Sequence, residues 1–551
     1  MSNTDHNVYN WNYGDILDGV ATVVPSSRPA LVFGDRMVTW QEFTHRTNNL
    51  AANLIKGGAA VGDKIAFYMR NCPEYSEGIA AGFKANLTHV NVNYRYIEDE
   101  LEYLLDNADA TVCIYKAEFA PQVAHIRDKL PLVKQWVEVA DGHPGLEDVL
   151  SYEELVVSGD GSPVDVDRTT NNMLFLYTGG TTGMPKGVMW RHYDLWMVMG
   201  GGGNPRAGIP ACMDLEEHLA RLAAAPAGPV NLPLPPLMHG TGLLSAISAM
   251  TNGGTCITLP SRSFEPELAL EAIDKHRVTA VTIVGDAFAR PMLEVLDAQP
   301  GKYDISSVMI ISSSGVMWTK DVKAGLLRHH ENMMLADGFS SSEAIGLGSS
   351  IMTRDETVEV AKFTLGPSCK VFTEDHQEVV PGSGEPGMVA VTGFLPMGYY
   401  KDQEKTDKTF KTINGVRYSI PGDWVTVEAD GSLTLLGRGS NCINTAGEKV
   451  YPEEVEEALK NHESVVDCLV VGVKDDKWGQ SITAVVQLHP GYELEENELK
   501  DFAKKQLAAY KAPKRILAME NLERAPNGKA NYKLIKEFAE SSLGLTDQAV
   551  L

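Results

Sequence analysis

The chain has few of the features that mark secreted, zinc-binding or nucleic-acid-binding proteins. Its 551 residues include only seven cysteines, without a CxxC pair, which argues against a disulfide framework or a zinc site. Lysine and arginine number 48 against 73 aspartates and glutamates, and the net charge of −25 disfavours broad binding to nucleic acid. The sequence shows neither a membrane-spanning apolar run nor a signal peptide. We therefore expect a cytoplasmic protein with no transmembrane segment.

Strand-like and helix-like segments alternate along the chain. Thr39 and Glu42 are spaced as a capping box, and the helical pattern that they begin ends at Gly57. Strands are then predicted at Lys64–Met69, Thr88–Val92 and Thr111–Tyr115, with helices at Glu74–Ala85 and Glu98–Asp106. Because such alternation is typical of βαβ units, we expect an α/β fold with a mainly parallel sheet.

The most informative stretch is MLFLYTGGTTGMPKGV, at Met173–Val188. Its apolar start predicts a buried strand, and the glycines after it let backbone N–H groups approach an anion closely. Threonine hydroxyls and one lysine add donors, so the pattern predicts a phosphate-binding loop formed by Thr178, Gly179, Gly180, Thr181, Thr182, Gly183 and Lys186. A Walker A loop is excluded, because Lys186 is followed by glycine rather than by serine or threonine.

This stretch resembles the signature of the adenylate-forming superfamily, which contains acyl-CoA synthetases, peptide-synthetase adenylation domains and luciferases. A glycine-rich turn without a ligand would look the same in isolation, so further motifs decide. Ser312–Val316 resembles the family's adenine-side loop and includes Gly315. Ala336–Glu343 resembles the Tyr-Gly-x-Thr-Glu motif, with Ser340 in place of glycine and Ser342 in place of threonine.

The resemblance implies roles for these residues. Phe339 would stack on adenine, Ser342 would contact phosphate, and Glu343 would hold Mg²⁺, for which a carboxylate is the expected ligand. The remaining members of the nucleotide and metal site implied in this region are Asp337, Gly338 and the hydroxyl of Thr178. The resemblance therefore implies ATP and Mg²⁺ as ligands, with Thr178 and Glu343 taking part in catalysis.

The motifs continue in order through the last part of the chain. Asp423, with Pro421 where threonine is usual, resembles the ribose-binding aspartate, and Arg438 resembles the arginine that reaches the ribose and phosphate. Ser440 stands at the family's hinge, where Asp or Lys is usual. Two later stretches resemble the lining of the pantetheine tunnel and the loop of the adenylation lysine; their residues are Gly447, Lys449 and Lys529. CoA is thus implied as a co-substrate.

The acyl side of the site is expected around His239, Gly240 and Gly285. In the family the position matching His239 commonly lies beside the acyl pocket, although a histidine among apolar residues is also often a hydrogen-bonded structural residue. The neighbourhood is small and uncharged, which is consistent with a bulky apolar acid. The variants GGTTGMPKGVMWRH and SSSGVMWT resemble most closely the synthetases of long-chain and steroid-side-chain acids.

Together, the resemblance of these motifs implies an acid-thiol ligase of the α/β class with two domains: a large N-terminal domain of mixed βαβ sheets, residues 1–437, and a smaller, mobile α+β C-terminal domain, residues 438–551. It would activate a carboxylic acid as acyl-AMP with ATP and then transfer the acyl group to CoA. Two alternatives share the ATP-binding residues: an acyl-AMP ligase that serves a carrier protein, and a nucleotide-binding protein without catalysis. Beyond the acid, ATP and CoA, the pattern leaves homo-oligomerisation open.

Overall fold

The computed structural model describes residues 9–180, 183–204, 208–225, 227–316, 318–354, 362–441, 443–445, 448–475, 479–507, 510–525 and 528–545. The chain divides into two compact units. The first comprises Met1–Val360 and Val391–Ser419, and the second comprises Ala361–Ala390 and Ile420–Leu551. Both contain helices and strands, which confirms the mixed α/β class with a large N-terminal part and a smaller C-terminal part.

The first unit contains an eight-stranded sheet in the order β19-β9-β8-β4-β3-β5-β6-β7. Its central pairs, β8 with β4, β4 with β3, β3 with β5 and β5 with β6, are parallel, as the βαβ prediction requires. The strands are β3 (Lys64–Tyr68), β4 (Thr88–Asn91), β5 (Ala110–Lys116), β6 (Gln135–Val139), β7 (Leu150–Ser151), β8 (Met173–Gly180), β9 (Gly183–Arg191) and β19 (Gly398–Tyr399).

Helices cover this sheet and bury both of its faces. Ile65 and Phe67 of β3 join one core, whereas Ala66 and Tyr68, which alternate with them, join another. The helices of this region are α1 (Tyr13–Val23), α2 (Trp40–Lys56), α3 (Pro73–Lys84), α4 (Glu98–Asn107), α5 (Ala120–Ile126) and α6 (Tyr152–Val157), with short 3₁₀ turns η1 (Ala117–Phe119) and η2 (Arg127–Lys129). The capping box predicted at the start of α2 is present, with the Thr39 side chain accepting from Glu42 N–H.

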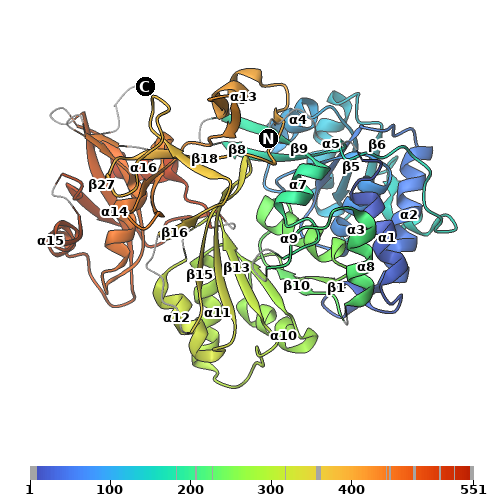
Figure 1. Ribbon diagram of the computed structural model, residues 1–551, viewed down its shortest axis with the longest axis horizontal. Coiled ribbons are helices and arrows are strands. Elements are labelled where there is room, and N and C mark those ends of the chain that lie inside the picture. Colours follow the sequence, from blue (N-terminus) through green and yellow to red (C-terminus); the bar gives the residue numbers. More distant parts are fainter. Residues whose placement is uncertain are drawn as a thin grey trace. The chain divides into compact units, whose positions relative to one another are not determined.

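A second series of strands in the first unit runs in the order β2-β1-β11-β10-β12-β13-β14-β15. Neighbouring strands from β1 to β14 are parallel, whereas the pairs at the two ends, β2 with β1 and β14 with β15, are antiparallel. Helices α10 to α12 pack beside these strands (Figure 1). The elements are β1 (Pro29–Phe33), β2 (Arg36–Thr39), β10 (Val230–Pro233), β11 (Thr255–Thr258), β12 (Ala280–Ile283), β13 (Ile310–Ser314), β14 (Met334–Ser341), β15 (Ala344–Met352), α9 (Gly240–Thr251), α10 (Pro266–His276), α11 (Asp286–Ala298) and α12 (Lys320–His329).

The glycine-rich stretch between residues 200 and 229 contains a short helix. This helix, α8 (Leu215–Ala224), follows α7 (His192–Val198) and is capped by Asp214, whose side chain accepts from Glu217 N–H. The remaining elements of the first unit are α13 (Gln403–Thr409) and the antiparallel pair β20 (Phe410–Ile413) and β21 (Val416–Ser419).

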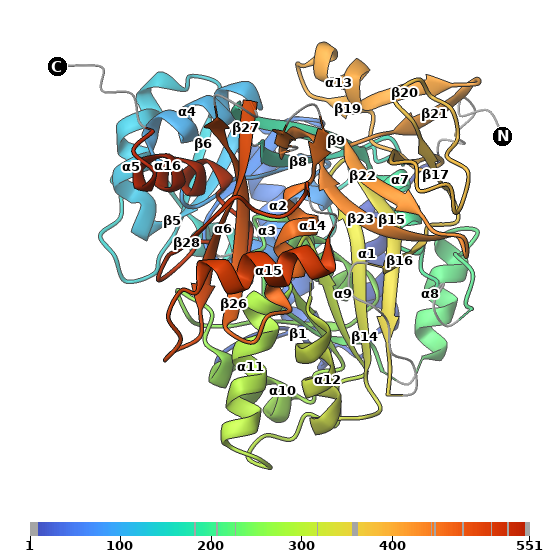
Figure 2. The same cartoon turned by 90° about the vertical axis from the view of Figure 1, so that its left-hand side faces the viewer.

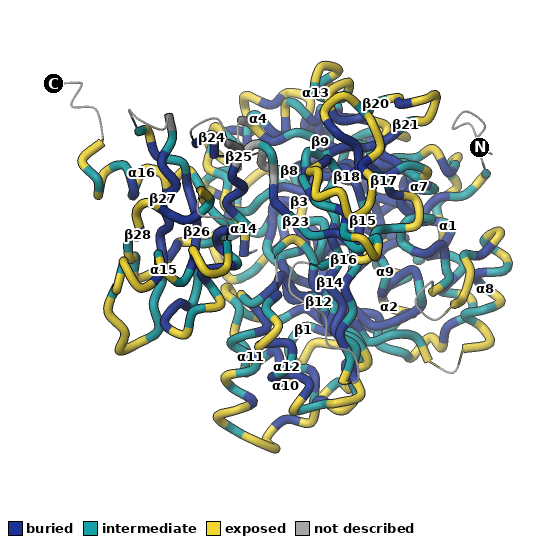
Figure 3. The backbone as a smooth tube through the Cα atoms, turned by 60° about the vertical axis from the view of Figure 1, so that its left-hand side comes forward, coloured by how far each residue is buried: buried dark blue, intermediate teal, exposed yellow. Residues whose placement is uncertain are grey.

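The second unit is built mainly from antiparallel strands. One group pairs β16 with β23, β23 with β22, β22 with β18 and β18 with β17, and a separate five-stranded sheet has β27 paired with β24, β26 and β28. Figure 2 shows α15 and α16 beside this sheet, and Figure 3 shows the buried backbone of the strands in dark blue. The elements are β16 (Lys362–Leu365), β17 (Cys369–Phe372), β18 (Gly387–Val391), β22 (Asp423–Val427), β23 (Ser432–Arg438), η4 (Gly439–Asn441), β24 (Ile443–Thr445), β25 (Glu448–Val450), β26 (Val465–Asp475), β27 (Gly479–Leu488), β28 (Arg515–Ala518), α14 (Pro452–Lys460), α15 (Glu496–Gln506) and α16 (Tyr532–Ser542).

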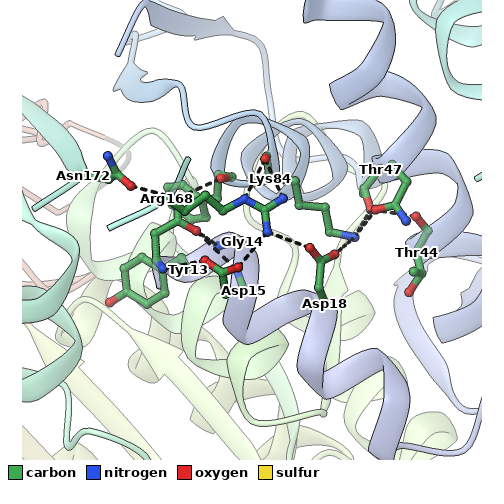
Figure 4. A network of polar contacts seen from close by, with 12 residues as sticks. Tyr13, Gly14, Asp15, Asp18, Thr44, Thr47, Lys84, Arg168 and Asn172 are labelled. Atoms are coloured by element: carbon green, nitrogen blue, oxygen red, sulfur yellow. Dashed lines mark hydrogen bonds and ion pairs between the residues drawn. The ribbon is translucent and has the colours of Figure 1, made fainter. Parts of the chain in front are cut away.

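A buried polar network ties the N-terminal helix α1 to the rest of the first unit (Figure 4). Lys84, only 1% exposed, lies 3.1 Å from Oδ1 of Asp18 and donates to the side chain of Thr47. Arg168 reaches Oδ2 of the same aspartate at 2.8 Å and Oδ1 of Asp15 at 3.0 Å. Burial lowers the pKa of Lys84, and Asp18 opposes that effect by stabilising its charge. The network therefore links α1, α2, α3 and the segment before β8 through paired charges.

None of the helices within the described ranges has the length and apolar character needed to cross a membrane.

Candidate nucleotide and acyl site

The described residues of the predicted phosphate-binding loop belong to an antiparallel hairpin. The apolar run from Met173 is strand β8, as predicted, but the strand continues through Thr178 to Gly180, and β9 returns beside it. Thr178 lies opposite Lys186, and Gly180 lies opposite Gly183. Thr181 and Thr182 lie outside the described residues, and Gly179 is described only by its backbone. The strand predicted from the apolar run was shorter than β8, because threonine and glycine are typical turn residues.

Lys186 is held close to the turn of this hairpin, opposite Thr178. Its ammonium group forms an ion pair with Asp402, whose Oδ1 also accepts from Lys405 N–H at 2.9 Å and so caps α13. The Lys186 side chain remains 36% exposed. A phosphate group would therefore have to share or displace the Asp402 contact in order to bind Lys186.

Glu343 lies in the turn between β14 and β15, and two contacts to Glu343 and one to the preceding residue hold this turn. The Tyr399 hydroxyl donates to its Oε1, the Ser419 hydroxyl donates to its backbone carbonyl at 2.7 Å, and Trp190 Nε1 donates to the carbonyl of Ser342 at 2.9 Å. Trp190 belongs to β9, and Tyr399 pairs with Val188 of the same strand. The fold thus brings the Thr178 hairpin and Glu343 together, although they are far apart in sequence.

The adenine-side residues follow neighbouring parallel strands. Ser313 of β13 is in register with Ile283 of β12 and with Asp337 of β14, while Ser314 is in register with Gly338. Gly285 and Gly315 come after β12 and β13, and the buried Phe339 lies near the end of β14, so all three are at the same edge of the sheet. Gly315 has a φ of +100°, a backbone conformation that favours glycine.

Asp337 has a partner that the sequence did not indicate. Its carboxylate forms an ion pair with Lys323 of α12, and both side chains are about one-tenth exposed. Burial raises the pKa of Asp337, while Lys323 and the Ser313 hydroxyl favour the ionised form. Ser313 Oγ in turn accepts from Gly285 N–H at 2.9 Å. Asp337 is therefore linked through Ser313 to the loop that carries Gly285.

The acyl-side residues lie next to the same hairpin. His239 is half-buried and precedes α9, which starts at Gly240. A Cβ atom at Gly240 would lie 3.9 Å from Cδ1 of Leu176 on β8, so this glycine is beside the strand that leads to Thr178. The structure therefore places His239 and Gly240 near the hairpin, whereas Gly285 lies at the edge described above.

In the second unit, the two predicted ribose-binding residues are direct neighbours. Asp423 of β22 is buried and lies in register with Arg438 of β23. A Cβ atom at Gly437 would come within 1.9 Å of Oε2 of Glu453 on α14, so a larger residue would require that side chain to move, and the φ of +118° at Gly437 itself favours glycine. Ser440 lies in the 3₁₀ turn η4, and Lys449 lies on β25 opposite Asn444. Gly447 falls outside the described residues.

Lys529 follows a tight loop that Arg524 anchors. Arg524 forms two hydrogen bonds with the Asp467 carboxylate and donates to Gly528 C=O at 3.2 Å. Ala525 N–H donates to Lys529 C=O at 2.9 Å, and the Lys529 residue is exposed. Burial alone would raise the pKa of Asp467, but the contact from Arg524 lowers it. The ion pair between Asp467 of β26 and Arg524 therefore holds this loop.

Sequence reasoning missed Tyr399, Asp402, Lys323 and Asp467, the partners that hold the predicted residues. Each is a common residue type without a motif of its own, and only the fold brings it to the site.

The arrangement offers donors to an anion at the hairpin and a fixed carboxylate as an oxygen ligand for a cation. It is compatible with a nucleotide and a divalent metal ion.

Comparison with known proteins is consistent with this geometry. Residues 18–400 match the family model described as AMP-binding enzyme, and residues 454–529 match the AMP-binding enzyme C-terminal domain. The 3-oxocholest-4-en-26-oate--CoA ligase of Rhodococcus rhodochrous is 40% identical over 538 residues, which cover 96% of this chain and 95% of the relative. The medium/long-chain-fatty-acid--CoA/3-oxocholest-4-en-26-oate--CoA ligase of Mycolicibacterium smegmatis is 38% identical over 540 residues and 96% of each chain.

A solved structure shares the fold at lower sequence identity. The anthranilate CoA ligase AuaEII, in complex with anthranoyl-AMP, superposes with a TM-score of 0.82 at 21% identity, covering 97% of this chain and 98% of its own. The first family model spans more than half of the chain, and the curated relatives match it over nearly its full length. The chain therefore belongs to the AMP-binding enzyme family.

Proposed function

We propose that the protein is an AMP-forming acyl-CoA synthetase that activates a hydrophobic carboxylic acid, either a steroid side-chain acid or a medium- or long-chain fatty acid. The observation that carries this proposal is the 40% identity, over 96% of the chain, with a CoA ligase for a steroid side-chain acid. The 38% identity with a ligase named for both acid classes adds the fatty acids.

In the first half-reaction, a carboxylate oxygen of the acid attacks the α-phosphorus of ATP. An acyl–oxygen–phosphorus bond forms, the bond to the β-phosphate oxygen breaks, and pyrophosphate leaves. Negative charge spreads over the phosphate oxygens, so oriented donors stabilise the transition state. We assign this role to the Thr178 hairpin, to Lys186 once it shares its contact with Asp402, and to Lys529, with Gly315, Gly338, Phe339, Asp423 and Arg438 binding the nucleoside.

The residues around Glu343 fit a magnesium ion. Its carboxylate is a hard oxygen ligand held by Tyr399, and Mg²⁺ needs only one or two protein carboxylates beside phosphate oxygens and waters. When bound, Mg²⁺ would neutralise charge on the phosphates. The hydroxyl of Thr178 is the second protein group that we assign to it.

In the second half-reaction, the thiol sulfur of CoA attacks the acyl carbonyl carbon. A carbon–sulfur bond forms, the carbon–oxygen bond to AMP breaks, and the thiol proton is lost. We propose that residues 438–551 turn about Ser440 between the two half-reactions, with Gly447 and Lys449 beside the thiol arm. Rotation of backbone φ and ψ needs no charged side chain, so Ser440 is compatible with a hinge.

The acyl chain would lie on the side of His239, Gly240 and Gly285. Leu176, Leu243 and Met238 in this neighbourhood are buried and apolar, which suits a hydrophobic acid better than acetate. A location in the cytoplasm and a homo-oligomeric state both remain predictions.

The test is pyrophosphate release with ATP and Mg²⁺ across acetate, benzoate, octanoate, palmitate and steroid side-chain acids, with and without CoA. We expect CoA-dependent turnover on palmitate or a steroid acid at higher kcat/KM than on acetate. Pyrophosphate release that does not depend on CoA would favour an acyl-AMP ligase that serves a carrier protein. Nucleotide binding without pyrophosphate release on any acid would favour a non-catalytic nucleotide-binding protein.

A further inference from the structure

A buried asparagine connects the two substrate sides of the first unit. Asn91 is the last residue of β4 and is 4% exposed. Its Oδ1 accepts from Tyr177 N–H at 2.7 Å, and its Nδ2 donates to Tyr177 C=O at 2.9 Å and to Met238 C=O at 2.7 Å. Both amide hydrogens and the amide oxygen are therefore used, and the partners allow only one orientation of the amide group.

The hydrogen-bond partners of Asn91 lie next to residues that are predicted to bind the two substrates. Tyr177 immediately precedes Thr178, in the phosphate-binding hairpin, and Met238 immediately precedes His239, on the acyl side. The backbone pairing of β4 with β8 runs through Val90 and Phe175, and the side chain of Asn91 extends this link to Tyr177. One amide group thus binds the backbone directly before each of the two predicted substrate-binding residues.

Side chains supply part of the anchorage of the acyl-side segment, residues 233–238, in which Leu234 N–H also donates to Thr282 C=O at 3.0 Å. It contains Pro233, Pro235 and Pro236, which have no backbone N–H to donate. A second amide, that of Asn71, accepts from Leu237 N–H at 2.7 Å and donates to Pro235 C=O at 3.3 Å. Asn71 therefore holds the same segment as Asn91, and its two hydrogen bonds go to that segment alone.

We propose that Asn91 is a positioning residue that sets the separation between the phosphate-binding hairpin and the acyl-side segment; this rests on the proposed function. In-line attack requires the acid oxygen and the α-phosphorus at about 3–3.5 Å, and a displacement of about 1 Å can lower the rate about 100-fold. Among the described residues, the side chain of Asn91 binds only the backbones of Tyr177 and Met238, so it would act on Thr178 and His239 through the residues that precede them. Its loss should therefore lower the rate of reaction between bound substrates more than the binding of either.

The experiment compares Asn91→Ala and Asn91→Asp with Asn71→Ala, in the full-length protein, on whichever acid the wild type turns over. Asparagine and aspartate have nearly the same shape, but the ionised carboxylate introduced by Asn91→Asp has no hydrogen to donate. We expect kcat for pyrophosphate release to fall about 30- to 100-fold in both Asn91 variants, with the KM values for ATP and acid changed less than about threefold. Asn71→Ala should change kcat less than about fivefold and affect mainly the KM for the acid.

A pH profile provides a readout that general loosening of the fold would not move. Protonation of the introduced carboxyl group restores one donor, so the ratio of Asn91→Asp to wild-type kcat should rise as the pH falls from about 8 to about 6. Melting temperatures identify the folded variants.

Several results would overturn the proposal: unchanged kcat in a folded Asn91 variant, parallel losses in Asn91→Ala and Asn71→Ala, a pH-independent ratio, or failure of both Asn91 variants to fold while Asn71→Ala folds. A wild type that releases no pyrophosphate with any acid would instead refute the proposed function.

Discussion

The hydroxyl of Tyr399 donates a 2.6 Å hydrogen bond to Oε1 of Glu343, and the two residues are 4% and 9% exposed. Tyr399 belongs to the two-residue strand β19, where it pairs with Val188 of β9. The proposed metal ligand is thereby oriented by a residue attached to the strand that returns from the phosphate-binding hairpin. A displacement of this strand would move both the donors for phosphate and the carboxylate for Mg²⁺.

We expect Tyr399→Phe to raise the Mg²⁺ concentration for half-maximal pyrophosphate release about 10-fold, because partners that orient a metal ligand typically contribute about 10- to 100-fold in affinity or activity. A magnesium titration measures this change. Tyr400→Phe is the matched control, since the Tyr400 hydroxyl donates to Asp109 at 2.7 Å instead. Equal magnesium dependence in the two variants would contradict the assignment of Glu343.

Lys529→Ala should abolish acyl-AMP formation while largely sparing thioester formation from supplied acyl-AMP. The lysine stabilises charge only in the first half-reaction, and loss of one preorganised donor typically lowers the rate about 100- to 1,000-fold. Each half-reaction is assayed separately, by pyrophosphate release and by CoA consumption. Lys533→Ala, an exposed lysine on α16, should leave both rates unchanged. Equal loss of both half-reactions in Lys529→Ala would refute this role.

Glu456→Gln should stabilise the second unit at alkaline pH. Burial raises the pKa of Glu456 to about 7, and its carboxylate accepts from Val470 N–H and from the Tyr532 hydroxyl. A raised folded-state pKa means that stability is lost as the pH rises from about 4.5 through about 7, by up to about 3 kcal/mol. Glutamine does not titrate, so the gain in stability of Glu456→Gln over the wild type should appear near pH 8 and vanish near pH 4.5.

Unfolding curves at several pH values, with exposed Glu520→Gln as the control, test the Glu456 prediction. A constant difference between Glu456→Gln and the wild type across this range would show that titration of Glu456 does not contribute.

Lys84→Met should lower the free energy of unfolding of the first unit by about 1–3 kcal/mol, because it removes the buried donor to the side chains of Thr47 and Asn48 and leaves the partly exposed carboxylate of Asp18 with one cation fewer. Urea denaturation measures the loss. Lys56→Met, on the exposed surface of α2, should change stability by less than about 0.5 kcal/mol. Similar stability of the two variants would mean that Arg168 alone compensates Asp18 in the network of Figure 4.

Local patterns in the sequence were sufficient for the fold class and for the first alternating strands and helices of the first unit. The strand predicted at Lys64–Met69 is β3, and the helix predicted at Glu74–Ala85 is α3, with ends that differ by one residue. These elements follow from apolar periodicity and from caps, which act between residues close in sequence. The motifs were likewise sufficient for the family, since each is a short contiguous run.

What only the tertiary structure decided is which side chains hold the motif residues in place. Tyr399 reaches Glu343 across 56 residues, and Asn91 reaches Met238 across 147. Lys323 and Asp337 pair because α12 packs beside β14, and neither residue has a distinctive neighbourhood in the sequence. Such contacts depend on strand order and register, which arise from the packing of the whole sheet rather than from any local pattern. The sequence by itself therefore determined the chemistry that the site offers, and the fold decided how that chemistry is positioned.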